Sequence, residues 1–497
     1  MEERAAACGT TVVLCLAVAT VIAHLATGGR YGFDRDELAT LDDARRLAWG
    51  YVAYPPITPF FGRLSLELFG ESLRGFRFFA VLAEAVAVVV TAYMARTLGG
   101  RRGAQVVSAL AAVPFCIAGG ALMQYVLFDY LCWVLTEYFV MRLLASGDPR
   151  WWIAIGSAVG LGMNAKYGMV FLIAGILGGM LLTNTRRYFG SKWLWCGVAI
   201  AFAVFLPNLV WQARHDFVSL DFLRHIHDRD VRIGRTRTFL PEQLEMTLFA
   251  FPLATAGLSF YFSRAGRRFR MLGWLYVIPL VLFVVGKGRG YYLAAAYPML
   301  YAAGAVWGER RLAKYSTHAA TSIRVAAYVA LAFQAVLFSA IFLPMAPVNS
   351  PWWRVANNAN GDLREEIGWP ELVQTVANIR DSLPPAERAR ARVLTGNYGE
   401  AGAIDLYGPR YGLAPTLSLT NSYWYRGYGD PAPDTLILVG FTREFADHHF
   451  NRCEVAGHTW NQYGIANEET EDHPDIFVCH GLRGNWPDFW NSHRRYG

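Results

Sequence analysis

The sequence predicts a mainly α-helical protein that crosses a membrane many times and ends in a small α/β domain. Three observations predict this fold class: many hydrophobic residues, few charged ones, and a change of pattern near residue 345. Hydrophobic residues make up 54% of the 497 residues and charged residues 17%, whereas about a quarter is charged in an average protein. The net charge of +7 is spread over loops between apolar segments. It therefore predicts contact with a lipid bilayer and gives no sign of nucleic-acid binding.

Eleven apolar segments are candidates for membrane-spanning helices, each of which needs roughly 17 to 25 mostly apolar residues. Two adjoining pairs are short and meet at Lys166 and at Lys287 and Arg289, so each pair is expected to form a hairpin that turns near one membrane face. The segments are 10–28, 75–95, 103–120, 126–144, 151–165, 167–183, 193–212, 244–262, 271–286, 290–307 and 322–343.

Short basic loops on alternate sides of these segments predict the orientation. Such loops face the cytoplasm in membrane proteins, which places the N-terminus inside. The long loops 29–74 and 213–243, and everything after Leu343, then lie outside. The basic residues of the inner loops are Arg96, Arg101, Arg102, Arg150, Arg186, Arg187, Lys192, Arg264, Arg267, Arg268, Arg270, Arg310, Arg311 and Lys314.

The chain divides into a membrane domain, 1–344, and an extracytoplasmic α/β domain, 345–497. In the second part "GWPELVQTVANIRDSL" has helical periodicity, whereas "RVLTG", "DTLILVG" and "DIFVC" are typical of short buried strands. Cys453 and Cys479 lie in this part and would pair in an oxidising compartment. The sequence alone leaves that pairing open, because it does not give their separation.

The first outer loop contains the stretch "FDRDEL". Asp34 and Glu37 have the spacing of a helix capping box, and Leu38, Leu41 and Ala44 continue with an apolar stripe. We expect an amphipathic helix on the outer membrane surface here, and a second one in "ITPFFGRLSLELF". Capping does not account for Asp36. The residues alone leave two roles open for it: a favourable acid in the first turn of a helix, or a functional carboxylate.

The sequence resembles the bacterial GT-C-type glycosyltransferases related to protein O-mannosyltransferases and lipid A aminoarabinose transferases. One departure is Tyr54, where relatives often carry His before the Pro pair. The motifs that carry the resemblance are "FDRDEL" (33–38), "RRLAWGYVAYPPITP" (45–59), "MQYVLFDYLCWVL" (123–135), "NAKYGMVFL" (164–172), "GKGRGYYLAAAYPML" (286–300), "NYGEAGAIDLYG" (397–408) and "NSYWYRG" (421–427).

The resemblance implies a GT-C fold and an inverting hexosyl- or pentosyltransferase that uses a polyprenyl-phosphate-sugar donor. It also implies that Asp36 and Glu37 serve the chemistry, in which a carboxylate accepts the proton of the acceptor hydroxyl. The acceptor would be an extracytoplasmic lipid, glycan or protein. The expected location is the bacterial inner membrane, with the active site and the C-terminal domain on the periplasmic side.

Basic and aromatic residues at the two hairpin turns are the candidates for binding the donor phosphate. They are Lys166, Lys287, Arg289, Tyr291 and Tyr292. Arg offers phosphate a fixed fork of donors. The alternative is that the basic residues extend to the membrane interface, where tyrosines are also common.

Asp129 lies near the outer end of an apolar segment, where an acid usually has a partner. It either pairs with a basic residue or, as relatives suggest, helps to hold a divalent metal ion of unknown identity. The chain contains no nucleotide-binding motif, so no nucleotide cofactor is expected. A lipid or solute transporter without enzymatic activity is the alternative function.

Overall fold

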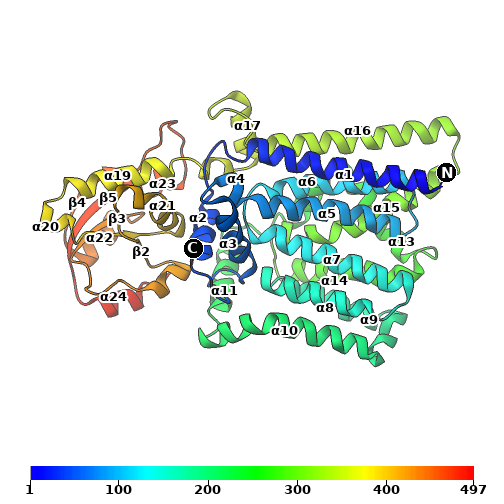
Figure 1. The fold of residues 1–497 in the computed structure, drawn as a ribbon, viewed down its shortest axis with the longest axis horizontal. Coiled ribbons are helices and arrows are strands. Elements are labelled where there is room, and N and C mark those ends of the chain that lie inside the picture. The colour runs from blue at the N-terminus through cyan, green and yellow to red at the C-terminus, as the bar shows by residue number, and fades with distance from the viewer. Residues whose placement is uncertain (1) are drawn as a thin grey trace.

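The computed structural model describes residues 2–497, with side chains from Gly9 onwards. A bundle of long, roughly parallel helices carries a smaller sheet domain at one end (Figure 1). We call this end the domain end and the opposite one the basic end. The bundle helices are α1 (Glu2–Thr27), α5 (Phe78–Thr97), α6 (Arg102–Gly120), α7 (Tyr125–Ser146), α8 (Trp151–Ala165), α9 (Met169–Leu181), α10 (Lys192–Arg214), α13 (Phe251–Phe262), α14 (Arg270–Val285), α15 (Tyr297–Leu312) and α16 (Thr317–Phe342).

Every predicted spanning segment coincides with a helix, but the helices differ in length and polarity. Among the described residues, seven are long and apolar enough to cross a membrane, or eight if one bent pair counts as a span. The helices α8, α9 and α15 are shorter than 18 residues, and α7 carries Asp129, Glu137 and Arg142. These helices pack against the longer ones, so the bundle around them accommodates their length and charge. The chain is thus a multi-pass membrane protein.

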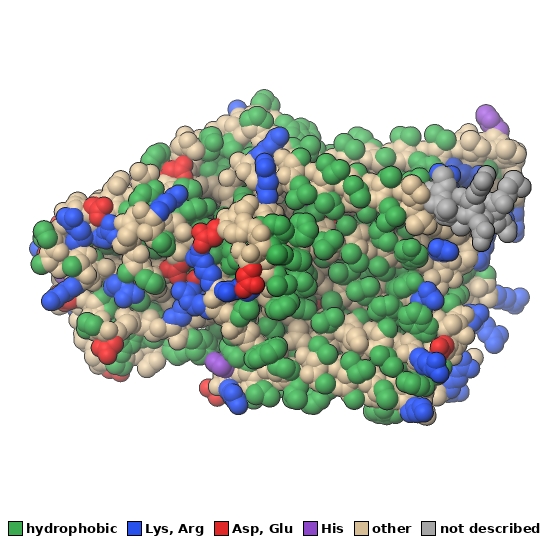
Figure 2. All heavy atoms as spheres, in the orientation of Figure 1, with side chains coloured by type: hydrophobic (Ala, Val, Ile, Leu, Met, Phe, Trp, Pro, Cys, Tyr) green, Lys and Arg blue, Asp and Glu red, His purple; other side chains and the backbone are tan. Residues whose placement is uncertain are grey.

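The outer surface of the bundle separates hydrophobic from charged side chains. Hydrophobic side chains cover its flank, and Lys and Arg gather at the basic end, away from the sheet domain (Figure 2). This arrangement matches the short basic loops of the sequence, such as the start of α6 with Arg101 and Arg102.

Short helices lie between the bundle and the sheet domain. Helix α12 (Phe239–Thr247) is not one of them, because it continues towards α13 and the two form one candidate membrane span, Phe239–Phe262. The short helices are α2 (Arg35–Arg45), α3 (Ile57–Phe69), α4 (Leu73–Phe76) and α11 (Val218–Arg232). Both helices predicted in the first outer loop are therefore present. However, the apolar stripe of α2 does not face lipid: Leu38 and Leu41 are fully buried, and α2 packs against α21 (Tyr398–Tyr407) of the C-terminal domain.

The C-terminal domain is built on a five-stranded sheet of order β2-β1-β3-β5-β4. Strand β1 pairs in parallel with β2 and β3, whereas β5 runs antiparallel to β3 and β4. The strands are β1 (Arg392–Thr395), β2 (Leu417–Ser418), β3 (Thr435–Val439), β4 (Phe450–His458) and β5 (Asp475–Leu482). The other helices of this domain are α17 (Pro351–Ala359), α18 (Asp362–Glu365), α19 (Trp369–Ser382), α20 (Pro385–Arg388), α22 (Arg443–His449), α23 (Glu468–Glu471) and α24 (Trp486–Ser492).

The predicted strands correspond to β1, β3 and β5, and the predicted helix to α19. Strand β2 has only two residues, and β4 is exposed along most of its length, so neither has the apolar run that predicts a buried strand. Cys453 and Cys479 are paired residues of β4 and β5 and form a disulfide. The structure thereby answers a question that the sequence left open.

Candidate active site

A cavity of about 570 Å³ lies at the domain end of the bundle. Its walls come from α2, the segment 53–55, the first half of α7, the α8–α9 turn, α11, the segment after α14, and three segments of the C-terminal domain. The cavity therefore collects residues that are far apart in the chain, such as Asp36 and Gly497.

Helix α2 begins with the predicted capping box. The Asp34 carboxylate accepts the backbone N–H of Asp36 at 2.8 Å, and the Glu37 carboxylate accepts the backbone N–H of Asp34 at 3.0 Å. Burial and the nearby carboxylates of Asp36 and Asp362 raise the pKa of Asp34 well above its ordinary value. Asp34 therefore holds the helix terminus.

Asp36 lies on the cavity side of the same turn and is half-buried. One carboxylate oxygen accepts the Tyr398 hydroxyl at 2.8 Å, and the other accepts the Gln124 amide at 3.1 Å. Both partners are neutral, and an ionised carboxylate offers about four acceptor sites. The Asp36 carboxylate is thus fixed in orientation but keeps free acceptor capacity towards the cavity.

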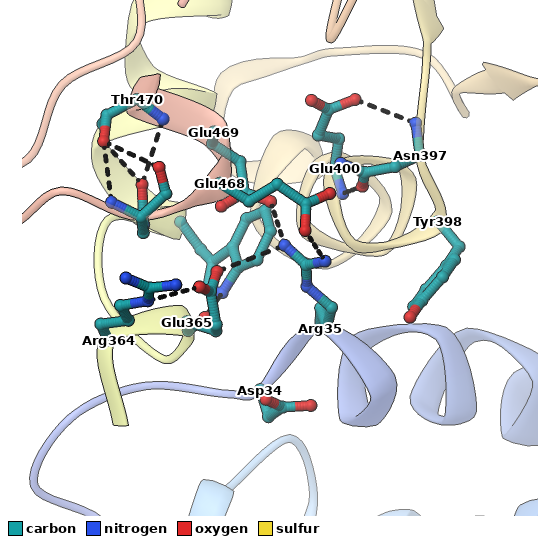
Figure 3. A network of polar contacts seen from close by, with 12 residues as sticks. Asp34, Arg35, Arg364, Glu365, Asn397, Tyr398, Glu400, Glu468, Glu469 and Thr470 are labelled. Atoms are coloured by element: carbon teal, nitrogen blue, oxygen red, sulfur yellow. Dashed lines mark hydrogen bonds and ion pairs between the residues drawn. The ribbon is translucent and has the colours of Figure 1, made fainter. Parts of the chain in front are cut away.

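The position of Tyr398 depends on close packing between α2 and α21. Tyr398 is the first residue of α21, which is capped by Asn397. One turn later, a Cβ atom at Gly402 would lie 2.7 Å from the carbonyl carbon and oxygen of Leu38. Only glycine permits this approach, and it places the Tyr398 ring over the start of α2 (Figure 3). Residue 398 was not among the sequence-predicted site residues.

Glu37 has a different environment. Its side chain is fully buried and is not among the residues that line the cavity. It accepts two hydrogen bonds from Arg77, at 2.8 and 2.6 Å, and one from the backbone N–H of Met123 at 2.8 Å. Together with the capping bond from the backbone N–H of Asp34, the Glu37 carboxylate accepts four hydrogen bonds, and Arg77 compensates its charge. The geometry favours a structural role for Glu37 in the support of α2, and the catalytic role predicted for it stays a prediction.

The predicted cations do meet in one place. Lys166, Lys287, Arg289 and Tyr292 all line the cavity. The Lys166 ammonium lies 4.1 Å from the ring centre of Tyr292 and 4.9 Å from that of Tyr291. Tyr291 contributes through this contact and is not itself a lining residue.

Arg289 forms an ion pair with Asp230, a residue that was not predicted from the sequence to be part of the site. Its Nε donates to Asp230 of α11 at 2.5 Å, and Asp230 is buried. One arginine nitrogen is thus committed to an ion pair. The remaining donors of the guanidinium are available to the cavity, since Arg has five N–H groups. Arg229, the neighbour of Asp230, adds a further cation to the lining.

Asp129 also lines the cavity, and its Oδ1 is buried without a hydrogen-bond partner. Within residues 2–497, no three His, Cys, Asp or Glu side chains are placed to hold a metal ion. The donor set on the protein side thus does not reach three ligands. A metal-binding role for Asp129 stays a prediction.

The part of the cavity inside the bundle is apolar. Met163, Val170, Phe171 and Phe283 contribute to its wall, and the rings of Phe171 and Phe283 are 4.4 Å apart. The cavity therefore has a charged half at the domain end and an apolar half that continues between the bundle helices.

Arginines of the first outer loop attach the C-terminal domain above this cavity. Arg35 donates to Glu365 at 3.2 Å and to Glu469 at 3.0 Å, and it also binds Glu468 (Figure 3). Burial raises the pKa of Glu469 to about 7, although Arg35 opposes the shift. Arg77 extends the contact to Glu366 at 3.1 Å. Asp36 and Tyr398 therefore meet across an interface held by ion pairs.

Tyr54, the departure from the resembling sequences, also lies in the cavity wall. Its hydroxyl donates to the Asp43 carboxylate at 2.8 Å, and Arg426 binds the same aspartate at 3.2 Å. Tyr54 thus supports an acid of α2. The sequence marks Tyr54 by its position before the Pro pair, but no local pattern identifies Asp43 as its hydrogen-bond partner.

The fold and the cavity together define a class: a polytopic membrane protein in which loops at the domain end and the C-terminal domain enclose a cavity lined by a carboxylate and a group of cations. Comparison with known proteins agrees. The family model for dolichyl-phosphate-mannose-protein mannosyltransferases matches residues 53–211. The chain is 23% identical over 279 residues to the lipid A galacturonosyltransferase RgtD of Rhizobium johnstonii, an alignment that covers 52% of this chain and 58% of that protein.

Solved structures show the same fold over almost the whole chain. ArnT from Cupriavidus metallidurans bound to undecaprenyl phosphate has a TM-score of 0.59 at 15% identity, covering 94% of this chain and 97% of that one. The archaeal oligosaccharyltransferase AglB from Archaeoglobus fulgidus, in complex with an inhibitory peptide and a dolichol-phosphate, has a TM-score of 0.55 at 11% identity, covering 86% and 69%. The GT-C fold implied by the sequence motifs is confirmed, and so is the resemblance to ArnT-like glycosyltransferases.

Proposed function

We propose that the protein is a membrane glycosyltransferase that moves a sugar from a polyprenyl-phosphate carrier to an extracytoplasmic acceptor, with inversion at the anomeric carbon. The observation that carries the proposal is one cavity with Asp36 on one side, Lys166, Lys287 and Arg289 on another, and an apolar half inside the bundle. Transfer of a sugar from a lipid phosphate needs all three: a base for the acceptor, cations for the phosphate and apolar walls for the lipid chain.

The apolar half suits the prenyl chain, because burying its methylene groups there removes apolar surface from water. The cations suit the phosphate, since hydrogen bonds between ionised groups are about twice as strong as neutral ones. Lys166 is positioned by its ring contacts and Arg289 by Asp230. Tyr291 and Tyr292 complete this side of the cavity around Lys166.

In the proposed reaction, the acceptor hydroxyl gives its proton to the Asp36 carboxylate while its oxygen forms a bond to the anomeric carbon. The bond between that carbon and the phosphate oxygen breaks, and polyprenyl phosphate leaves with the electron pair. Cations that already face the phosphate stabilise the charge that develops on it. Attack from the face opposite the leaving group gives inversion.

The neutral partners of Asp36 agree with a base. Gln124 and Tyr398 orient the carboxylate without forming an ion pair with it. Glu37, in contrast, is neutralised by Arg77. We therefore assign the base to Asp36 alone.

The proposed site faces the periplasm in a bacterial inner membrane, with a hexose or pentose as the transferred sugar. The basic end of the bundle supports this orientation, since short basic loops favour the cytoplasm. The Cys453–Cys479 disulfide supports it from the other end, because disulfides persist in oxidising compartments.

Sugar transfer from a natural lipid pool tests the proposal. Purified protein is mixed with a membrane lipid extract that carries radiolabelled polyprenyl-phosphate sugars, and labelled products are separated from the donor. We expect label to leave the donor only when the protein is present, with release of polyprenyl phosphate. Donor that stays intact but crosses between leaflets would instead indicate a transporter.

A further inference from the structure

A second cavity, of about 400 Å³, lies where α7, α9 and α14 reach the basic end. The same three helices reach the first cavity with their opposite ends, through Asp129, Val170 and Phe283. Helix α9 has 13 residues, which corresponds to about 20 Å at 1.5 Å per residue. The two cavities therefore lie at opposite membrane faces, so the second one is separate from the proposed active site.

Positive charge dominates the second cavity. Arg187, Arg267, Arg268 and Arg270 line it, and none of its described lining residues is Asp or Glu. Tyr188 adds a neutral hydroxyl to the lining, whereas the hydroxyls of Thr183 and Thr185 are hydrogen-bonded within the protein. The arginines surround one hollow.

The arginines differ in how many of their N–H groups have hydrogen-bond partners within the protein. Arg268 donates to the carbonyl of Leu144 at 2.6 Å and to that of Ala145, so it builds the wall at the end of α7. Arg270, in contrast, is half-buried in the cavity wall and donates no hydrogen bond from its buried Nε. Its guanidinium thus adds a charge to the wall that the protein does not neutralise with an acid among the described residues of the cavity lining. Arg187 and Arg267 are exposed at its rim.

The surroundings indicate which acceptor fits. Leu182 lines the cavity and is 57% exposed, and its neighbour Leu181 is 64% exposed. Large exposed apolar side chains beside a basic hollow match a lipid with an acyl region and an anionic headgroup. Basic pockets between membrane helices on the cytoplasmic side are known to bind such headgroups.

We propose that this cavity binds the phosphate headgroup of an anionic phospholipid from the leaflet opposite the active site. Arg270 and Arg187 bind the phosphate, Arg268 holds the wall, and Leu181 and Leu182 contact the acyl chains. The bound lipid would fasten the ends of α7, α9 and α14 together. The site needs no sugar transfer, so its test is independent of the proposed reaction.

The test titrates full-length protein in detergent with phosphatidylglycerol and counts bound lipids by native mass spectrometry. Phosphatidylcholine and inorganic phosphate are the comparison probes. The site variant is Arg187→Gln with Arg270→Gln. The control is Arg101→Gln with Lys314→Gln, which removes the same charge from loops at the same end that do not line the cavity.

We expect one tightly bound phosphatidylglycerol per chain, with the site variant weakening it roughly tenfold or more, as the loss of charge-assisted bonds implies, and the control leaving it unchanged. If the double variant aggregates, the single variant Arg187→Gln serves instead, because Arg187 is exposed. Equal affinity in site variant and control would overturn the proposal, as would equal binding of phosphatidylcholine. Occupation by inorganic phosphate alone, with no gain from the lipid, would overturn the lipid assignment.

Discussion

The two faces of helix α2 hold adjacent carboxylates in opposite ways. On the cavity face, Asp36 is held by two neutral donors, Tyr398 and Gln124. On the buried face, Glu37 is paired with Arg77 and accepts two backbone N–H groups as well. The difference teaches that residue type and position near a membrane surface do not decide function. The charge and number of a carboxylate's partners decide whether it can still accept a proton.

Breaking the buried pair should give the largest effect. Arg77→Met leaves Glu37 as an uncompensated buried charge, which costs about 3–5 kcal/mol of stability. Thermal unfolding and membrane yield measure this. The matched control is Arg63→Met, which breaks the exposed pair with Glu67 and should cost less than about 1 kcal/mol. A variant at Arg77 that keeps normal stability would show that Glu37 is not structural.

The ion pairs around Arg35 predict a dependence of stability on pH. Burial raises the pKa of Glu469 from its ordinary 4.5 to about 7, so the folded protein binds this proton more tightly than the unfolded chain. Its contribution is therefore fully present below about pH 4.5 and is lost as pH rises towards 7, by an amount on the order of 1–3 kcal/mol. Glu469→Gln, which mimics the neutral acid, should flatten thermal unfolding profiles between pH 5 and 8; an unchanged slope would contradict this.

The cation side of the cavity predicts effects on donor use. Lys166→Met and Arg289→Gln each remove a charge from the proposed phosphate site, with an expected loss of transition-state stabilisation of about 1.5–3 kcal/mol, measured as kcat/KM for the donor. Arg224→Gln is the control, because Arg224 lies on α11 but is 75% exposed and outside the cavity lining. Normal donor kinetics in both site variants would place the phosphate elsewhere.

The smallest expected effect concerns the orientation of Asp36. Tyr398→Phe removes one of the two hydrogen bonds that orient the Asp36 carboxylate and leaves the one from Gln124, so turnover should fall by roughly three- to tenfold while the donor KM stays the same. Tyr425→Phe is the control, since Tyr425 accepts a hydrogen bond from Arg494 at the protein surface. A change in KM without a change in turnover would show that Tyr398 binds donor and does not position the base.

Local patterns in the sequence were sufficient for much of the fold. The capping box of α2 and the hairpin turns at Lys166 and Lys287 depend on neighbouring residues, and all three are found as expected. The apolar face of α2 was expected against lipid because its cover, α21, is more than 350 residues away in the chain. Periodicity identifies an apolar face but not the element that packs on it.

The candidate site likewise contains residues that local motifs identify and residues that only contacts between distant segments identify. Asp36 and the cations were found from motifs within a few residues, whereas Tyr398 and Asp230 act through contacts with distant segments. The partner that sets Glu37 apart from Asp36 is Arg77, which lies 40 residues further along the chain. Sequence patterns could therefore propose both carboxylates but could not show that their surroundings differ.

The most direct test of this account compares Asp36→Asn with Asp34→Asn at equal membrane yield. Asn at 36 keeps the shape of the side chain but cannot accept the acceptor's proton, so turnover should fall by roughly 10²-fold or more. Asn at 34 still caps α2, since Asn and Asp rank together at that position, so turnover should stay near normal. The measurement is the rate of sugar transfer from radiolabelled polyprenyl-phosphate donor at saturating acceptor. An inactive Asp36→Asn beside an active Asp34→Asn is the predicted result, and near-normal turnover in Asp36→Asn would contradict the central claim.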